Sequence, residues 1–394
     1  MHPSVSFVDL RAQHEEVRSE IQAALRDIID RSSFIGGSYV HTFEKQFAEY
    51  LGVKEVVGVA NGTDGLWLGM MEMGIGPGDG VITVPNTFIA TTEAITRCGA
   101  RPLFVDIDLA TATMDAQALR QFLSEECRLN EDGKTIHLST GVRVAAILPV
   151  HLYGFPADMT PLTQIATEYG LPLVEDACQA HGAKYCQNGQ WVRAGSMGTF
   201  ASFSFYPGKN LGAMGDAGAI ATNDAALAAR LRQVRDHGSV EKYIHYTPYG
   251  WNSRLDALQA AVLAIKLKKL DEWNERRRTS AAYYREAFTR AGLPVALPVE
   301  PGYGQHVYHL YVVRVEDREG LRKFLSAQGI GVGLHYPIAL HLQKAYQHLG
   351  YPPGSFPNAE TSAATLLSLP MHQALTSEQI DYVVETCARF YAGH

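Results

Sequence analysis

The sequence predicts an α/β fold in which a large domain with a mostly parallel sheet is followed by a smaller α/β domain. Two observations support this prediction. Short apolar strand patterns alternate with helical patterns between residues 56 and 237, and repeated strand–helix units of this length require a parallel sheet with helices on both faces. The chain has 394 residues, of which 46% are hydrophobic, so it can bury a large core and should divide into at least two folding units.

The N-terminal part of the chain is predicted to be helical before the alternation begins. Apolar residues between Val17 and Ile29 recur at the spacing of one helix face, which predicts an amphipathic helix over residues 12–31. The segment 32–37 interrupts this helix, and a second short helix is expected at 43–51. The alternating region then has predicted strands at 56–60, 81–84, 102–106, 144–152, 172–176, 201–205 and 218–222, and helices from 66 onwards, up to Cys98, and at 115–123, 161–169 and 224–237.

The pattern changes after Gly250. Long helices are predicted at 255–270 and 273–288, followed by a strand at 310–315, a helix at 318–328, a strand near 332–336 and a closing helix at 377–391. We therefore expect a large domain at residues 1–250, including the N-terminal helical segment, and a smaller C-terminal domain at 251–394 that the chain enters through a long helix. The stretch 127–142 is interpreted as a polar loop or small hairpin, with contact to substrate or to a partner subunit as the alternative.

Composition and charge exclude several classes of function. The formal net charge is −7, and the one basic cluster, Arg276–Arg278, lies in a helical pattern with acidic residues nearby, so a nucleic-acid partner is not expected. The five cysteines are widely spaced and odd in number, which supports neither a disulfide framework nor a zinc site. No secretory or membrane-spanning pattern is present, so we expect a cytoplasmic protein without a membrane partner.

One lysine, Lys209, stands where a buried strand pattern ends. Phe203 and Phe205 alternate with small residues, and Pro207 and Gly208 then stop the strand. A cation beside so much apolar sequence is costly unless it is paired, neutral or covalently engaged. Lys209 is therefore the first candidate for chemistry, and a solvated lysine in a surface turn is the alternative.

Other strand ends carry polar or aromatic residues, and ligands of parallel sheets bind at the carboxyl ends of strands. Gly62 and Thr63 open a helix whose free N–H groups suit a phosphate, although ordinary capping explains them equally well. Asp176 follows an apolar strand, where a carboxylate needs a cationic partner unless it is a helix cap. Ser204 offers a hydroxyl and Phe88 an aromatic wall, unless both simply pack. Together with the lysine, these residues describe a pocket for pyridoxal 5′-phosphate.

Eight ordered motifs extend over nearly the whole chain: Phe7–Leu10, Ala60–Asp64, Gly76–Asp79, Pro149–Gly154, Glu175–Gly182, Ser204–Gly212, Asn252–Asp256 and His335–Pro337. In these motifs the chain closely resembles the DegT/DnrJ/EryC1/StrS family of pyridoxal-phosphate-dependent sugar aminotransferases. The resemblance implies fold type I, the aspartate aminotransferase-like fold with a mixed, mostly parallel sheet. It also implies a homodimer whose two active sites lie at the subunit interface.

The resemblance implies a role for each candidate residue. Lys209 corresponds to the lysine that forms the Schiff base with the cofactor, and Asp176 to the carboxylate that pairs with the pyridine nitrogen. The other residues that the resemblance places at the cofactor are Gln179 and Phe88 at the ring, Gly62, Thr63 and Ser204 at the phosphate, and Asn252 reaching the phosphate from the other subunit. No metal is expected.

The activity implied by the resemblance is transamination. An amino acid, expected to be L-glutamate, gives its amino group to a nucleotide-linked keto-sugar, expected to be a dTDP- or UDP-3-keto sugar, with pyridoxamine 5′-phosphate formed in turnover. His335 and Tyr336 fall on the substrate side. Two alternatives stay open: a keto-sugar dehydratase or deoxygenase, although its relatives carry histidine in place of Lys209, and a non-catalytic regulator that binds the cofactor.

Overall fold

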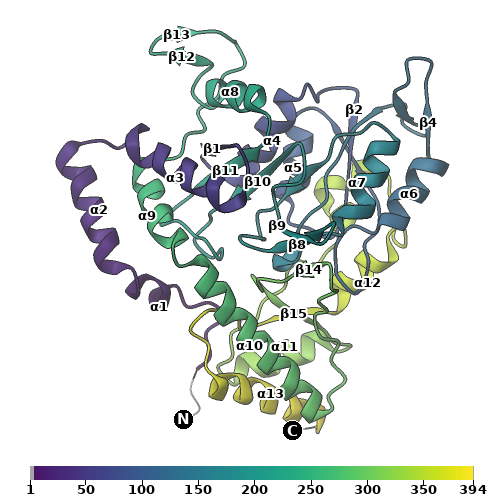
Figure 1. Ribbon diagram of the computed structural model, residues 1–394. Coiled ribbons are helices and arrows are strands. Elements are labelled where there is room, and N and C mark those ends of the chain that lie inside the picture. Colours follow the sequence, from purple (N-terminus) through teal and green to yellow (C-terminus); the bar gives the residue numbers. More distant parts are fainter. Residues whose placement is uncertain (1–3, 394) are drawn as a thin grey trace.

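The computed structural model describes residues 4–393, and its centre is a mixed sheet made of two segments (Figure 1). One segment has the strand order β1-β11-β10-β7 and the other β3-β2-β6-β5-β4. Parallel bridges between Ile147 and Leu173 and between Val150 and Asp176 join the two at β6 and β7. The strands of this sheet are β1 (Glu55–Val59), β2 (Asp79–Thr83), β3 (Arg101–Phe104), β4 (Cys127–Leu129), β5 (Thr135–His137), β6 (Arg143–Ile147), β7 (Val174–Asp176), β10 (Phe200–Ser204) and β11 (Gly218–Thr222).

The predicted mostly parallel sheet is confirmed. β2 pairs in parallel with both β3 and β6, and β7 pairs in parallel with β10, whereas β11 runs antiparallel to β1 and β10. β4 and β5 form an antiparallel hairpin, which confirms the hairpin interpretation of the stretch 127–142. The parallel strands therefore direct their carboxyl ends, including those of β7 and β10, to one edge of the sheet.

The helices of the first part of the chain match the predictions, with two exceptions. The helix expected at 43–51 begins earlier, at Gly37. The expected helix at 12–31 is two helices, α1 and α2, because Val17 leaves the helical conformation (φ −127°, ψ 12°). That bend lets Val17 pack with Ile21, Val262 and Trp273. The helices are α1 (Leu10–Glu15), α2 (Arg18–Arg31), α3 (Gly37–Leu51), α4 (Gly62–Glu72), α5 (Ala90–Arg97), α6 (Ala116–Glu125), α7 (Met159–Glu168) and α8 (Ala225–Val234).

Two hairpins were not predicted. β8 (Lys184–Gln187) and β9 (Gln190–Arg193) pair across Asn188 and Gly189, which both adopt positive φ, and β8 also pairs with β14 (Gly304–Gln305). The Asn-Gly pair is a recognised signal for a hairpin turn, so this hairpin could have been predicted from the sequence. β12 (Ser239–Glu241) and β13 (Ile244–His245) form a second, exposed hairpin at the top of Figure 1.

The C-terminal part builds a second apolar core around α10, α11 and α13. Its small sheet pairs β15 with β16, so the predicted strand near 332–336 is wrong: only Gly333 bridges to Ser368, and the chain beyond it leaves the sheet. The elements are α9 (Ala257–Leu267), α10 (Leu270–Ala291), β15 (Tyr311–Arg314), α11 (Arg318–Ala327), α12 (Pro357–Thr365), β16 (Leu366–Leu369) and α13 (Ser377–Tyr391). α9 packs on α2 and α3 of the first part, and the domain division at residue 250 stays a proposal.

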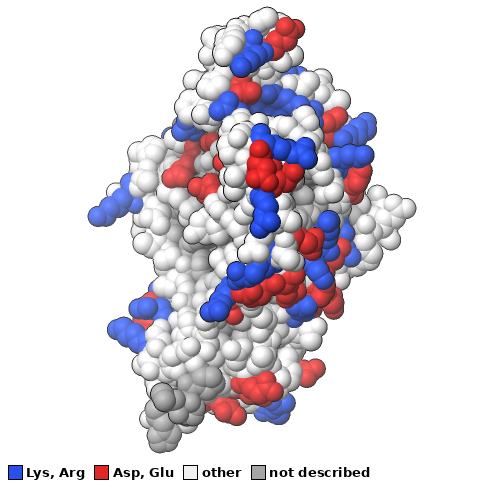
Figure 2. All heavy atoms as spheres, turned by 90° about the vertical axis from the view of Figure 1, so that its left-hand side faces the viewer, with Lys and Arg blue, Asp and Glu red and all other residues white. Residues whose placement is uncertain are grey.

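The surface carries mixed charge on the face that contains α2 and α3. Figure 2 shows Lys and Arg interspersed with Asp and Glu on this face, with uncharged areas between them. Within residues 4–393, no helix is both long enough and apolar enough to cross a membrane.

Candidate active site

Lys209 lies in a closed loop that follows β10. The loop is pinned by backbone hydrogen bonds from Ala213 N to Phe205 O and from Lys209 N to Tyr206 O, each 2.8 Å. In the part of the chain that the structure describes, no hydrogen bond or ion pair holds the Lys209 amine. Burial lowers the pKa of this amine, while the nearby Cys178 and Asp176 oppose that shift. The site therefore presents an unpaired, desolvated amine at the end of a strand.

Asp176 is the last residue of β7, and its carboxylate is buried and fixed. Thr91 Oγ1 on α5 donates to Asp176 Oδ2 at 2.8 Å, and the backbone N–H of Cys178 donates to Oδ1 at 3.2 Å. Sequence reasoning missed Thr91, because nothing in a helix pattern indicates which polar residue faces a strand end. Two donors thus hold a carboxylate in one orientation beside the lysine.

Replacement of Thr91 by valine should disturb this carboxylate without removing it. Thr91→Val keeps the branched shape but deletes the donor to Asp176, so we expect kcat to fall about tenfold, the equivalent of one hydrogen bond to a charged group. The KM for the amino donor should change less than kcat. Thr92→Val is the matched control, because among the described residues the wild-type Thr92 hydroxyl bonds to Ile89 O alone. Equal kcat values for the two variants would contradict the assigned contact.

Gln179, His335 and Tyr336 form one wall of the site through Tyr153. The backbone N–H of Tyr153 donates to Gln179 Oε1 at 2.8 Å, Gln179 Nε2 donates to the Tyr336 hydroxyl at 3.2 Å, and the Tyr153 hydroxyl donates to His335 O. The Phe88 ring lies 5.5 Å from that of Tyr336 and is 51% exposed. Tyr153 lies in the predicted motif Pro149–Gly154, but its contacts were not foreseen.

The titratable groups of this wall are neutral near physiological pH. Burial, aided by the charge of Lys209, lowers the pKa of His335 to about 4, and burial raises the pKa of the Tyr336 phenol. Behind Lys209, burial lowers the pKa of His181 to about 3 and that of His309 well below its usual value. The histidines around Lys209 therefore offer hydrogen-bonding groups without adding positive charge.

The start of α4 forms the opposite part of the site. Asn61 Oδ1 accepts from Asp64 N at 2.8 Å, which confirms a cap, yet among the described residues no acceptor takes the N–H groups of Gly62 and Thr63. A Cβ atom at Gly62 would lie 2.7 Å from Cys178 Sγ and 2.8 Å from Ser204 Cβ. Glycine is therefore required for the helix start to approach Ser204, and unpaired N–H groups at that place suit an anion.

Asn252 is the one candidate residue for which the described residues show no contact with the other candidates. It is exposed, its backbone bridges to Asp236, and within residues 4–393 its side chain makes no hydrogen bond. Its neighbour Ser253 donates to Asp64 Oδ2 at 2.7 Å, close to the start of α4. A role for Asn252 in the site of a second subunit stays a prediction.

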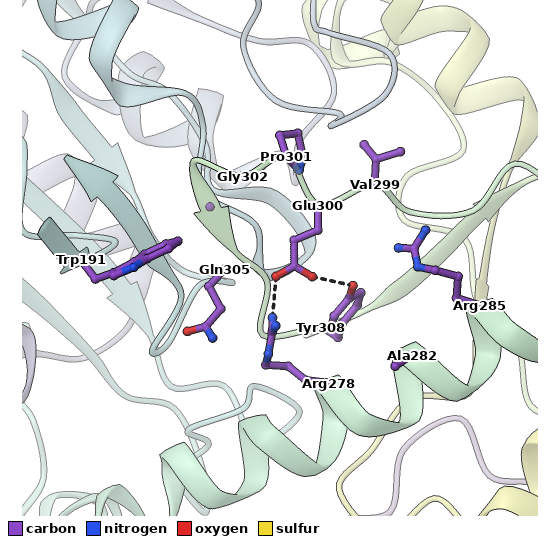
Figure 3. Close-up of a pocket in the computed structure, with 11 residues that line it drawn as sticks. Trp191, Arg278, Ala282, Arg285, Val299, Glu300, Pro301, Gly302, Gln305 and Tyr308 are labelled. Carbon is purple, nitrogen blue, oxygen red and sulfur yellow. Dashed lines mark hydrogen bonds and ion pairs between the residues drawn. The ribbon is translucent and has the colours of Figure 1, made fainter. Parts of the chain in front are cut away.

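A hollow of about 580 Å³ lies apart from these residues, between the β8–β9 hairpin and α10. None of the candidate residues lines it. Figure 3 shows Glu300 at its centre, where it accepts from Arg278 Nη1 at 2.6 Å and from the Tyr308 hydroxyl at 3.1 Å. The hollow is thus organised by an internal ion pair. In the described part of the chain, no group of three or more His, Cys, Asp or Glu side chains is placed to hold a metal ion.

An α/β fold with a desolvated lysine after one strand, a fixed carboxylate after its parallel neighbour and a free helix start beside them defines a pyridoxal-phosphate-dependent enzyme of fold type I. Residues 15–388 match the profile of the DegT/DnrJ/EryC1/StrS aminotransferase family. The chain belongs to this family and is an aminotransferase.

Individual relatives cover almost the whole chain. The "Pleiotropic regulatory protein" of Geobacillus stearothermophilus is 43% identical over 98% of this chain and 99% of the relative. The "dTDP-3-amino-3,4,6-trideoxy-alpha-D-glucose transaminase" of Streptomyces venezuelae is 44% identical over 97% of this chain and 95% of the relative. The crystal structure of S. venezuelae DesV in complex with a ketimine intermediate superposes with a TM-score of 0.90 at 43% identity, covering 99% of both chains.

The residues present fit the cofactor that this family implies. Lys209 has the unpaired amine that pyridoxal phosphate requires, Asp176 the carboxylate, and the start of α4 the unpaired N–H groups for a phosphate. Gly62 has no room for a side chain at that place. These features involve three elements of the fold, namely the loop after β10, the end of β7 and the start of α4, and they meet at one edge of the sheet.

Proposed function

We propose that this protein transfers an amino group from L-glutamate to a nucleotide-linked 3-keto sugar in amino-sugar biosynthesis, with Lys209 and Asp176 as the catalytic residues. The observation that carries the proposal is the unpaired, desolvated Lys209 amine beside the fixed Asp176 carboxylate. A dehydratase of the same ancestry would be expected to carry histidine in place of this lysine.

In the proposed mechanism, Lys209 moves protons and Asp176 holds charge. A lowered pKa leaves a larger fraction of the Lys209 amine unprotonated, so it can take the proton from the α-carbon of the amino donor and, in the second half of the reaction, deliver a proton to the sugar carbon that receives the amino group. Bound pyridoxal phosphate supplies the electron sink for the charge that this proton leaves behind. Asp176 would hold the ring nitrogen of the cofactor, and Thr91 with the Cys178 N–H fixes the direction of its carboxylate.

The other candidate residues bind and orient. Gly62, Thr63 and Ser204 are proposed to hold the phosphate, while Phe88 and Gln179 flank the ring. On the substrate side, His335 and Tyr336 are neutral hydrogen-bonding groups, which suits the hydroxyl and carbonyl oxygens of a sugar better than a charged partner. The similarity to a relative named for a dTDP-3-amino sugar supports a dTDP-linked 3-keto sugar as substrate, and a UDP-linked sugar is the second choice.

We further propose a homodimer with shared active sites. Apolar side chains are exposed on α2 and in the segment between α2 and α3, among them Ile29 at 60% and Ile35 at 57%. Exposed aromatic residues continue on the β12–β13 hairpin and its flanks, with Tyr243 at 81% and Tyr249 at 73%. Large apolar residues exposed in this number are typical of an interface.

Asn252 provides a test of the shared site. Loss of one hydrogen bond to a charged phosphate should weaken cofactor binding about tenfold in Asn252→Ala, and equilibrium dialysis against pyridoxal phosphate measures it. Glu286→Ala, at an exposed position on α10 outside the proposed interface, should bind as the wild type does. Sedimentation should give the same dimer for both variants, and unchanged cofactor binding in Asn252→Ala would argue against a phosphate role.

The overall function is tested by absorption spectroscopy of the purified protein loaded with pyridoxal phosphate. Its cofactor band should convert when glutamate is added and return when the correct dTDP- or UDP-linked keto-sugar follows, with an amino-sugar as product. Deoxygenation of the sugar without net amine transfer would favour the dehydratase. A cofactor band that does not change when glutamate is added would fit a regulator that binds the cofactor, the role in the name of the G. stearothermophilus relative.

A further inference from the structure

Lys266, on α9, is buried without a carboxylate partner. Its side chain is fully inaccessible to solvent (0% exposed), and among the ion pairs of residues 4–393 none involves it, although its exposed neighbours Lys268 and Lys269 pair with Glu20 and Glu272. Burial lowers the pKa of Lys266 to about 8. An ammonium in such a place is costly for folding, so a stability role does not account for it.

All three donors of the Lys266 ammonium are directed at the N-terminal helix and the loop of Lys209. Nζ donates to Gly212 O at 2.7 Å, to His14 Nε2 at 2.9 Å and to Gln13 Oε1 at 3.2 Å. Burial and the charge of Lys266 lower the pKa of His14, which keeps its Nε2 available as an acceptor. Gln13 Nε2 in turn donates to Asn210 O at 3.4 Å.

These contacts fall on the residues that follow Lys209 directly. Gln13 holds the carbonyl of residue 210 and Lys266 that of residue 212, so one connected pair of side chains fixes the backbone beyond the lysine. The loop is already folded tightly there, since a Cβ atom at Gly212 would lie 2.3 Å from Pro207 O. Because the loop has no spare room there, a shift of the carbonyl of residue 210 or 212 would also shift the neighbouring residues, including Lys209.

The helix that supplies Gln13 and His14 is itself anchored. Glu16, just after α1, accepts from Trp273 Nε1 at 3.0 Å and pairs with Arg276 at 2.7 Å, both on α10. Figure 1 shows α1 beside the junction of α9 and α10. The helix that supports the Lys209 loop is thus itself fixed to α10.

We infer that Lys266 is a positioning residue for Lys209: with Gln13 it clamps the carbonyls of Asn210 and Gly212 and so fixes where the Lys209 amine points. The inference rests on the proposed function only in taking Lys209 as the cofactor-binding lysine. Lys266 itself touches neither cofactor nor substrate in this arrangement.

The inference predicts a selective defect in cofactor binding. Lys209 condenses through Nζ with the aldehyde of pyridoxal phosphate, with loss of water, whereas pyridoxamine phosphate has no aldehyde and relies on the phosphate and ring contacts. A misplaced Lys209 therefore weakens binding of the first compound and not of the second. A general loss of packing would weaken both.

The test is Lys266→Met, which keeps the apolar length and removes the donors. We expect the dissociation constant of pyridoxal phosphate to rise at least tenfold while that of pyridoxamine phosphate stays within twofold, both measured by fluorescence titration. The melting temperature should not fall, because a buried charge is replaced by an apolar group. Lys268→Met, at the exposed residue directly after α9, is the control and should bind both compounds normally.

Two further measurements keep the test decisive. Gln13→Leu breaks the same clamp from α1, so it should show the same selective defect and can replace Lys266→Met if that variant does not fold. The double variant should bind pyridoxal phosphate no more weakly than either single variant. Unchanged binding in both single variants, or an equal loss for both compounds, would overturn the inference. The one assumption taken from the proposed function, that Lys209 binds the cofactor, is tested separately: if it is false, Lys209→Ala will retain pyridoxal phosphate as tightly as the wild type.

Discussion

Lys209→Arg should abolish transamination, with a fall in kcat/KM of at least about 10³-fold, because general acid–base catalysis by a positioned side chain contributes about 10²–10⁴-fold and the covalent role is lost as well. Arginine keeps a positive charge in the loop but does not deprotonate in proteins, so it can neither accept the α-proton nor form a bond to the cofactor. The measurement is the rate of amino-sugar formation from glutamate and the keto-sugar.

A small amine separates this chemical role from a structural one. Lys209→Ala leaves an empty space where the desolvated amine was, so added ethylamine should restore part of the activity to that variant and none to Lys209→Arg. Lys268→Arg, an exposed lysine paired with Glu20, should retain wild-type rates throughout. Full activity of Lys209→Arg would refute the assignment of Lys209, and with it the proposed mechanism.

The positions of the candidate residues explain how much of the site is visible in the sequence. Lys209 follows β10 and Asp176 ends β7, two strands with plain apolar patterns, and the parallel sheet brings strand ends together. The roles of Thr91 and Lys266 were not predicted, because they depend on which neighbouring element each helix face contacts. Lys266 lies two and three residues from Lys268 and Lys269, and only packing distinguishes the buried lysine from the exposed ones.

The fold shows the same limit. The strand–helix alternation was predicted correctly because each element buries a regular face of its own. The segment 332–336 has apolar residues of strand type, yet β16 takes the place beside β15. The last two residues of the segment 332–336 instead contact other side chains: His335 contacts Ser368, and Tyr336 contacts Gln179. A segment whose side chains contact the candidate site therefore leaves the regular structure that its composition favours.

Asp176→Asn should lower kcat by about 10³-fold while leaving the fold intact, since loss of one electrostatic contact in a preorganised site typically costs 10²–10³. The amide has the shape of the carboxylate but not its charge, so it does not keep the ring nitrogen protonated. Thr91 Oγ1 lies 3.0 Å from Thr87 Oγ1, so its hydroxyl can redirect to that partner. Asp176→Ala is expected to behave alike: it should still bind cofactor but transaminate very poorly.

The adjacent acid, Glu175, is the matched control because its carboxylate has a different task. Burial alone would raise the pKa of Glu175, but the hydrogen bond from His151 and the N–H groups of Gly198 and Gly195 lower it overall. Its charge therefore supports the fold above the ordinary carboxylate pKa, and that support is lost as pH falls through the lowered value.

Glu175→Gln should accordingly cost about 3 kcal/mol of stability, seen in the melting temperature, with a smaller effect on kcat in the folded fraction. Asp176→Asn should show the reverse pattern, a normal melting temperature and a large loss of kcat. Near-normal turnover in Asp176→Asn and Asp176→Ala would contradict the proposed electronic role of Asp176. A large loss of stability in both would instead make Asp176 a structural residue like its neighbour, because two acids at one strand end would then serve only the fold.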